Sequence, residues 1–205
     1  DQRDPDGDYD CLPFNSNAKN ILTIGAVDDV LNYTGPGDVS MSSFSGWGPA
    51  DDGRIKPDLV GNGVSVKSSI WDNNSYATFW GTSMASPNVA GSLLLLQQLY
   101  MELNNDEVMR SATLKGLAIH TARATGDGPA PDYRYGWGLL STRDAADLIS
   151  DASLNDSLLM ELTLFDGTTE SYTYVSDGSE DIKVTICWTD PPGTTKSGLN
   201  NREPA

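Results

Sequence analysis

Residues 81–87 read Gly-Thr-Ser-Met-Ala-Ser-Pro, and they stand directly before the apolar stretch that decides the fold. From Ser83 to about Leu99, apolar residues cover most of a helical circumference and charges are few. A helix that is apolar nearly all round belongs inside a protein. Pro87 suits the first turn of such a helix, where the missing amide hydrogen costs little. We therefore predict a buried helix that begins at this run.

Ser83 stands at the predicted N-terminus of that helix, where a serine gains three properties of a nucleophile. The first backbone amides of a helix have no intrahelical acceptor, so they can hold a developing oxyanion. The helix dipole favours negative charge at that end. Gly81 lets a substrate backbone approach closely. Serine is also a common helix cap, so the residue types alone leave both a nucleophile and a cap open.

Strands and a loop are predicted upstream of the helix. Residues 20–27 are apolar and rich in β-branched side chains, as in a buried strand. Residues 32–53 are crowded with Gly, Ser, Pro and Asp, which indicates a loop. Residues 64–70 form a second strand-like run, and residues 75–80 are a short aromatic stretch that leads into Gly81. This order of elements is typical of an α/β protein.

Two helices and an antiparallel module are predicted downstream. One helix runs from Asp106, as its N-cap, to about Ala122, and a shorter one spans residues 142–150. After residue 151 the pattern changes to the alternation of half-buried strands, over 158–165, 170–175 and 181–189. We therefore expect two domains, residues 1–150 and residues 151–205.

The run at residues 81–87, followed by Asn88-Val89-Ala90-Gly91, resembles the active-site serine signature of the subtilisin-like serine proteases (subtilase, peptidase S8 family). The family often has histidine where this chain has Asn88. Further similar segments are found in order at residues 18–27, 42–49, 56–60 and 135–138. The resemblance covers about residues 10–150. It implies a partial three-layer α/β fold with a mostly parallel sheet, followed by a truncated antiparallel β-sandwich like that of some larger members.

The resemblance also implies roles for particular residues. Ser83 would be the nucleophile that forms an acyl-enzyme, and its backbone amide would help to hold the oxyanion. Residues 11–17 would form the wall of the pocket for the substrate side chain before the scissile bond. The candidate substrate-binding residues there are Cys11, Leu12, Pro13, Phe14 and Asn15.

A serine nucleophile of this type needs a base and an orienting carboxylate, in the chain order Asp, His, Ser. The one histidine, His120, follows Ser83 and lies inside a predicted helix, where similar proteins carry a structural residue. No acidic residue before Ser83 stands in the aspartate motif of the family. We therefore expect the triad Asp and His and the oxyanion Asn in a missing amino-terminal half, and we expect this chain alone to be inactive.

Two other functions are consistent with parts of the sequence. A catalytically dead subtilisin-like domain that serves in binding or scaffolding is the alternative to a secreted endopeptidase of polypeptides. A β-sandwich binding module with an incidental α/β neighbour is disfavoured by the signature around Ser83. Half of a doubly wound sheet would expose apolar strand edges and the flank of the Ser83 helix. We therefore expect this chain either to self-associate or to need its missing half.

The charge excludes some partners. There are 29 acidic and 13 basic residues, a net charge of −16, and the lysines are scattered singly. Such a surface repels phosphate, so no nucleic acid or anionic membrane is expected as a partner. No apolar run approaches the roughly 20 residues of a membrane span. An extracellular location is expected from the family resemblance.

The first residues carry a candidate cation site. Asp4, Asp6, Asp8 and Asp10 alternate around a glycine, and hard oxygen ligands in a tight turn suit Ca²⁺. A solvated acidic turn is the alternative. No cofactor is required for the expected chemistry, and any Ca²⁺ would be structural. Cys11 and Cys187 stand in separate segments, so unpaired cysteines are favoured over a disulfide.

Overall fold

The computed structural model describes residues 12–50, 52–126, 128, 130–176, 178–179 and 181–191. Its regular elements are four strands, three α-helices and two short 3₁₀ helices. Their order along the chain is η1 (Phe14–Asn17), β1 (Ile24–Val27), η2 (Pro36–Asp38), β2 (Leu59–Asn62), β3 (Val66–Ser69), β4 (Tyr76–Phe79), α1 (Thr82–Leu103), α2 (Ser111–His120) and α3 (Thr142–Ala152). The α/β class expected from the sequence is confirmed.

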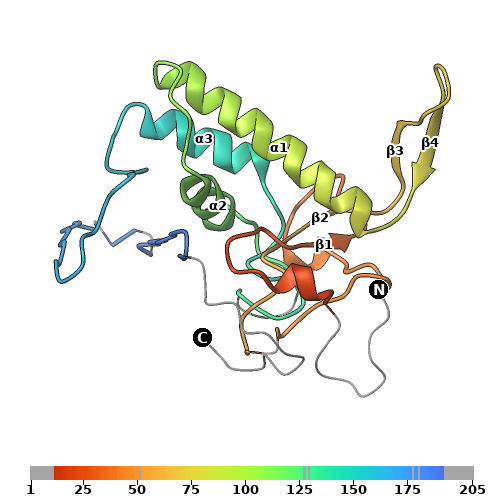
Figure 1. Cartoon of the computed structure of the whole chain (residues 1–205), viewed down its shortest axis with the longest axis horizontal. Helices are drawn as coiled ribbons and strands as arrows, with labels where there is room; N and C mark the ends of the chain where they lie inside the picture. The colour runs from red at the N-terminus through yellow and green to blue at the C-terminus, as the bar shows by residue number, and fades with distance from the viewer. Residues whose placement is uncertain are drawn as a thin grey trace.

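Strands β1 and β2 form a short parallel sheet at the centre of the α/β region (Figure 1). The register pairs Ile24 with Leu59 and Val27 with Asn62. Residues 138–140 continue the sheet beside β2, because Val60 donates to the carbonyl of Gly138 at 3.0 Å and accepts from the amide of Leu140 at 3.1 Å. The sheet is therefore assembled from segments that lie far apart in the sequence.

The two faces of this sheet are covered differently. On one face Val27 and Val60 pack in a core with Val39, Met41 and Tyr135, which come from loops. Helix α1 covers the other face, and it comes so close that a Cβ on Gly61 would lie 2.7 Å from Val89 Cγ2. Glycine at that position therefore permits the contact between the helix and the sheet.

A second core lies between the helices. Helices α1 and α3 run side by side, and α2 packs against both (Figure 1). Leu96 of α1 and Leu117 of α2 are buried there with Met109, Ala145 and Ile149. None of the helices in the described parts of the chain is long and apolar enough to cross a membrane.

Helix α1 is less buried than its composition predicts. Ala85, Val89 and Leu96 are buried on one stripe, whereas Leu94 and Leu95 are 70% and 62% exposed. The helix is therefore not buried all round, and its exposed flank agrees with the exposure expected for half of a doubly wound sheet. The physical reason is that the sheet and the other two helices cover only one side of it.

Two element boundaries also differ from expectation. Helix α2 begins at Ser111 with Arg110 as its N-cap, so the prediction of Asp106 as N-cap is wrong. Asn105 and Asp106 instead have φ values of 54° and 64°, and this left-handed conformation, which Asn and Asp tolerate, ends α1. Strand β2 was not predicted, whereas β3 and β4 fall within two predicted segments and form a hairpin that projects from the body (Figure 1).

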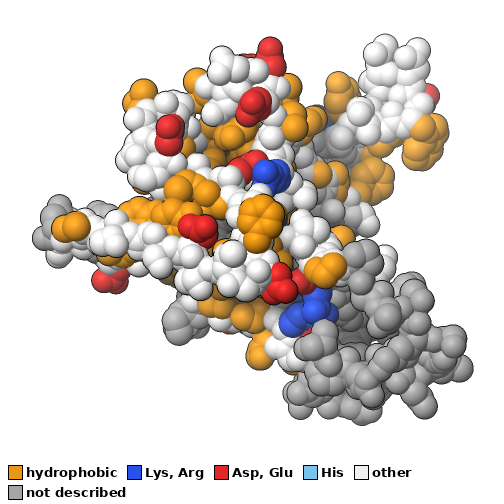
Figure 2. All heavy atoms as spheres, turned by 60° about the vertical axis from the view of Figure 1, so that its left-hand side comes forward, with side chains coloured by type: hydrophobic (Ala, Val, Ile, Leu, Met, Phe, Trp, Pro, Cys, Tyr) orange, Lys and Arg blue, Asp and Glu red, His pale blue; other side chains and the backbone are white. Residues whose placement is uncertain are grey.

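The described residues of 153–191 contain no β-strand, so the three strands expected there are not formed in this structure. The apolar side chains of this segment stay open to solvent, among them Val175 at 95% and Ile186 at 79%. Hydrophobic side chains gather on the surface in Figure 2, which brings forward the side of Figure 1 that carries this segment. A strand needs a paired neighbour and a covered face, and this segment has neither here. The division at residue 150 stays a prediction.

Candidate active site

Ser83 is the second residue of α1, and its side chain is exposed. The N-cap is Gly81, which has a φ of 150° and whose carbonyl accepts the amide of Met84 at 2.9 Å. No side-chain cap hydrogen bond is present at this helix start. The interpretation of Ser83 as a helix cap is therefore wrong, and its hydroxyl is presented to solvent at the positive end of the helix dipole.

The position of this helix start is set by the sheet. The amide of Gly81 donates to the carbonyl of Gly63 at 2.8 Å, and the amide of Gly63 donates to the carbonyl of Val27 at 3.1 Å. A Cβ on Gly63 would lie 2.6 Å from Ala26 Cβ and 2.8 Å from the carbonyl oxygen of Gly81. Any residue larger than glycine at position 63 would therefore keep Ala26, near the end of β1, from lying this close to Gly81, the residue before α1.

Ser83 lines a cleft of about 450 Å³. Three segments form the cleft: the first turns of α1, the 3₁₀ helix η1, and the stretch that leads into β1. The lining residues are Asn15, Ser16, Ile21, Leu22, Thr23, Ile24, Thr82, Ser83, Ser86 and Pro87.

The expected substrate-binding residues are only partly found on this cleft. Asn15 lines it, whereas Leu12 and Pro13 are described and do not. Cys11 and the side chain of Phe14 lie outside what the structure describes. Ser16 also lines the cleft and lies within the expected wall of residues 11–17. Residues 21–24 line it too and were missed as wall residues, because the sequence marks residues 20–27 only as a buried strand.

His120 is placed away from this cleft. It is the last residue of α2, and its Nδ1 lies 2.9 Å from Thr185 Oγ1. It lines a second cavity, of about 390 Å³, together with Cys187 and apolar residues of α2. Burial, followed by the nearby charge of Lys183, lowers the pKa of His120. Because this is the only histidine of the chain, no imidazole lines the Ser83 cleft.

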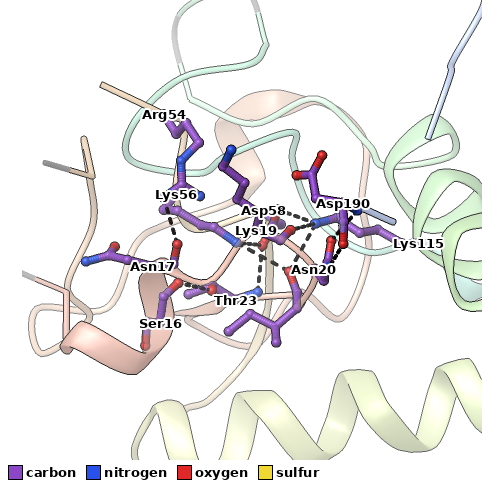
Figure 3. Close-up of polar contacts among 11 residues, drawn as sticks. Ser16, Asn17, Lys19, Asn20, Thr23, Arg54, Lys56, Asp58, Lys115 and Asp190 are labelled. Atoms are coloured by element: carbon purple, nitrogen blue, oxygen red, sulfur yellow. Dashed lines mark hydrogen bonds and ion pairs between the residues drawn. The ribbon is translucent and has the colours of Figure 1, made fainter. Parts of the chain in front are cut away.

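A buried cluster of charges lies behind the wall of the cleft. Lys56 and Asp58 form an ion pair with Nζ and Oδ2 2.6 Å apart, and the Lys115 ammonium lies 3.2 Å from the other carboxylate oxygen. Burial lowers the pKa of Lys56, and the hydrogen bond that Lys56 donates to Asp58 opposes that shift. Figure 3 shows this cluster beside the residues that follow η1.

No site for a metal ion is found among the described residues, which hold no group of three or more His, Cys, Asp or Glu side chains suited to one. The candidate Ca²⁺ ligands Asp4, Asp6, Asp8 and Asp10 lie outside those residues, as does Cys11. Cys187 carries a free thiol, and burial raises its pKa.

Comparison with known proteins agrees with this geometry. Residues 9–138 match the profile of the subtilase family, peptidase S8. The chain belongs to the subtilase family. The match contains Ser83, both strands of the parallel sheet, α1 and α2.

Other subtilases and subtilase-like structures are similar to this chain. It is 33% identical over 180 residues to the C5a peptidase of Streptococcus pyogenes, covering 86% of this chain and 14% of that protein. It is 32% identical over 138 residues to bacillopeptidase F of Bacillus subtilis, covering 62% of this chain and 9% of that protein. Among solved structures, the CspB protease of Clostridium perfringens is similar with a TM-score of 0.59 and 28% identity, covering 70% of this chain and 30% of that one. The partial subtilisin-like fold expected from the sequence is thus confirmed, and the chain spans about a seventh of the length of the C5a peptidase that it matches.

Proposed function

We propose that this chain supplies the nucleophile of a subtilase serine endopeptidase, and that Ser83 is that nucleophile. The observation that supports the proposal most is the place of Ser83. Its exposed hydroxyl lies in the first turn of α1 and lines a cleft that two other segments complete. An extended polypeptide could lie across this cleft with a carbonyl carbon at the serine.

The chemistry follows from the helix start. Ser83 Oγ attacks the carbonyl carbon of the scissile bond while a base takes the hydroxyl proton, and the same group then protonates the leaving amine. Water hydrolyses the resulting ester in a second step. The backbone amide of Ser83 helps to hold the negative charge that develops on the carbonyl oxygen, since the amides of Met84 and Ala85 already donate to the carbonyl of Gly81.

The base must come from outside this sequence. His120 does not line the cleft, and the chain has no other histidine. We therefore propose that the isolated chain does not hydrolyse peptides, and that an aspartate and a histidine of the parent protein complete the triad. We also propose polypeptides as substrates and an extracellular location. Subtilase membership supports both, and the acidic surface agrees with the location.

The proposal is tested on the complete protein that contains this chain. Ser83→Ala should reduce peptide hydrolysis by about a thousandfold or more, because the members of a triad act as a unit. Ser83→Ala should also abolish covalent labelling by a fluorophosphonate. Ser150→Ala is the matched control, since Ser150 is an exposed serine of α3 that does not line the cleft. That variant should keep both activities.

Hydrolysis that survives Ser83→Ala would contradict the proposal, as would Ser83-dependent hydrolysis by the isolated chain. If the complete protein binds peptides without cutting them and is not labelled, it is a binding or scaffolding domain of the subtilase fold. Sequencing the coding DNA upstream of Asp1 shows whether the triad Asp and His are encoded.

A further inference from the structure

Asp58 is a buried carboxylate with three partners on the wall side of the cleft. Its side chain is 8% exposed, and that of Lys56 is 3% exposed. Oδ2 accepts hydrogen bonds from Lys56 Nζ at 2.6 Å and from the backbone amide of Thr23 at 2.7 Å. Oδ1 lies 3.2 Å from Lys115 Nζ. Two lysines from separate elements therefore converge on one carboxylate.

Both lysines also bind the backbone of the segment between η1 and β1, as Figure 3 shows. Lys56 Nζ donates to the carbonyl of Ile21 at 3.3 Å. Lys115 Nζ donates to the carbonyls of Lys19 and Ile21, each at 3.0 Å. The cluster is thus attached to the chain at Lys19, Ile21 and Thr23. We define residues 15–24 as the wall segment. The three attachment points fall on alternate residues of it.

Further side chains extend this attachment to η1. Thr23 Oγ1 donates to the carbonyl of Ser16 at 2.6 Å, and Arg54 Nη2 donates to the carbonyl of Asn17 at 2.8 Å. Between Ser16 and Leu22 there is no strand or α-helix to hold the backbone. Side chains therefore fix the wall segment, and the hub among them is Asp58.

The wall segment is also the part of the chain that faces the nucleophile. Asn15, Ser16 and residues 21–24 line the cleft opposite Ser83. A buried ion pair is a poor way to gain stability, because the cost of removing charges from water offsets much of their attraction. A cluster of fixed geometry can instead set the position of a backbone to which it donates hydrogen bonds.

We propose that Asp58, Lys56 and Lys115 form a positioning cluster that sets the distance between the wall segment and Ser83, and so determines how tightly a peptide substrate binds. This inference rests on the proposed function. The three residues act through the wall segment and touch no reacting atom. Their loss should weaken substrate binding more than the chemical step.

Lys115→Met is the sharpest test, made in the complete protein. It keeps the length of the side chain and leaves the Lys56–Asp58 pair intact, while it removes the donor to Lys19 and Ile21. We expect KM to rise about fivefold or more with kcat changed by less than about twofold, the pattern of lost uniform binding. Amide exchange in peptides covering residues 15–24 should accelerate about tenfold, because hydrogen bonds from a charged donor are lost.

Two further variants control this test. Arg143→Met removes the same charge from a side chain that is 86% exposed and has no contact with the wall segment, and it should change neither KM nor exchange. Lys115→Arg restores a charged donor and should bring KM within about twofold of the unmodified protein. Asp58→Asn should change KM and the exchange of residues 15–24 in the same direction, and more strongly, because it removes the hub.

The outcomes separate this inference from the proposed function. A kcat decrease at unchanged KM, with faster exchange throughout β1 and α1, would mean a purely structural role and overturn the inference. Unchanged KM and unchanged exchange in Lys115→Met would overturn it too. If the complete protein cuts no peptide, the proposed function fails. Amide exchange still tests whether the cluster holds the wall segment. Acceleration confined to residues 15–24 would support the inference, and unchanged exchange would overturn it.

Discussion

Arg123 and Asp144 are joined by two parallel hydrogen bonds, from Nε to Oδ2 at 2.7 Å and from Nη2 to Oδ1 at 2.9 Å. The pair connects the segment after α2 to the first turn of α3. The guanidinium also lies over the Tyr33 ring, 5.0 Å from its centroid. This two-point geometry favours the ionised carboxylate, and it lowers the pKa of Asp144 to about 2, chiefly through the hydrogen bonds from Arg123.

The pair makes stability depend on pH in a defined window. The pKa of Asp144 is lower in the folded than in the unfolded state, so the stabilisation is present above about pH 3.8 and is lost as the pH falls toward 2. Asp144→Asn should lower the free energy of unfolding by about 1 kcal/mol at neutral pH, a reduced figure because solvent screens a side chain that is 39% exposed. Urea unfolding at pH 7 and near pH 2 measures the difference, which should be much smaller at the lower pH.

Asp147→Asn is the control for that experiment. Its partner Arg143 lies 3.9 Å away and both side chains are largely exposed, so its loss should change little at either pH. An Asp144→Asn protein as stable at pH 7 as the unmodified one would contradict the expected contribution.

The close approach at Gly63 gives a second prediction. Gly63→Ala would place a Cβ against Ala26 and the carbonyl of Gly81, and the backbone before Ser83 would have to move. We expect a loss of about 1–3 kcal/mol of unfolding free energy, the usual cost of overpacking. Thermal unfolding followed by circular dichroism measures it.

Gly91→Ala is the opposite change on the exposed side of α1. Apart from its own stretch of helix, nothing among the described residues lies within 4 Å of the Cβ that it would add. Alanine is favoured over glycine in a helix interior by about 1 kcal/mol, so this variant should be slightly more stable. Equal effects of the two substitutions would refute the packing argument.

The exposed leucines of α1 lead to a third prediction. Leu94 and Leu95 are 70% and 62% exposed on a helix whose other side is buried. We expect the isolated chain to self-associate through such apolar surface. The double variant with Leu94→Lys and Leu95→Glu should shift it toward monomer in solution scattering. Gln98→Glu, on the same helix, should not. A monodisperse monomer of the unmodified chain would disprove the expectation.

Binding of Ca²⁺ by Asp4, Asp6, Asp8 and Asp10 stays a prediction from the sequence. Titration calorimetry should give a Ca²⁺-dependent heat, and the melting temperature should rise with Ca²⁺ because a ligand of the folded state stabilises it. A variant with all four residues changed to Asn should give neither. Absence of both effects in the unmodified protein would exclude the site.

The start of α1 could be predicted within one residue, because Gly81 and the helical spacing of the apolar residues after it are both visible in the local sequence. The start of α2 could not. Asp106 has the residue type of an N-cap, yet its amide donates to the carbonyl of Met101 at 3.0 Å, and this bond terminates α1 instead. Residue type alone does not distinguish a cap that begins one helix from a turn that ends the previous one.

The candidate active site was likewise only partly predictable from the sequence. Ser83 could be predicted because its motif is contiguous. Asn15 and Ser16 were expected in the wall through the family resemblance, whereas residues 21–24 were not. The side chains that hold those residues are remote in sequence: Asp58 lies 35 residues from Thr23, and Lys115 lies 94 residues from Ile21. The exposed apolar residues of 153–191 show where the sequence pattern fails. Alternating apolar and polar residues predict a strand only where another strand is there to pair with it.

The open row of leucines on α1 also bears on how the protein responds to temperature. Apolar association is driven by entropy near room temperature and weakens on cooling. Complexes that this face forms, with another copy or with a partner, should therefore loosen in the cold and re-form on warming. A preparation kept on ice and one kept at growth temperature would then differ in particle size while containing the same folded chain.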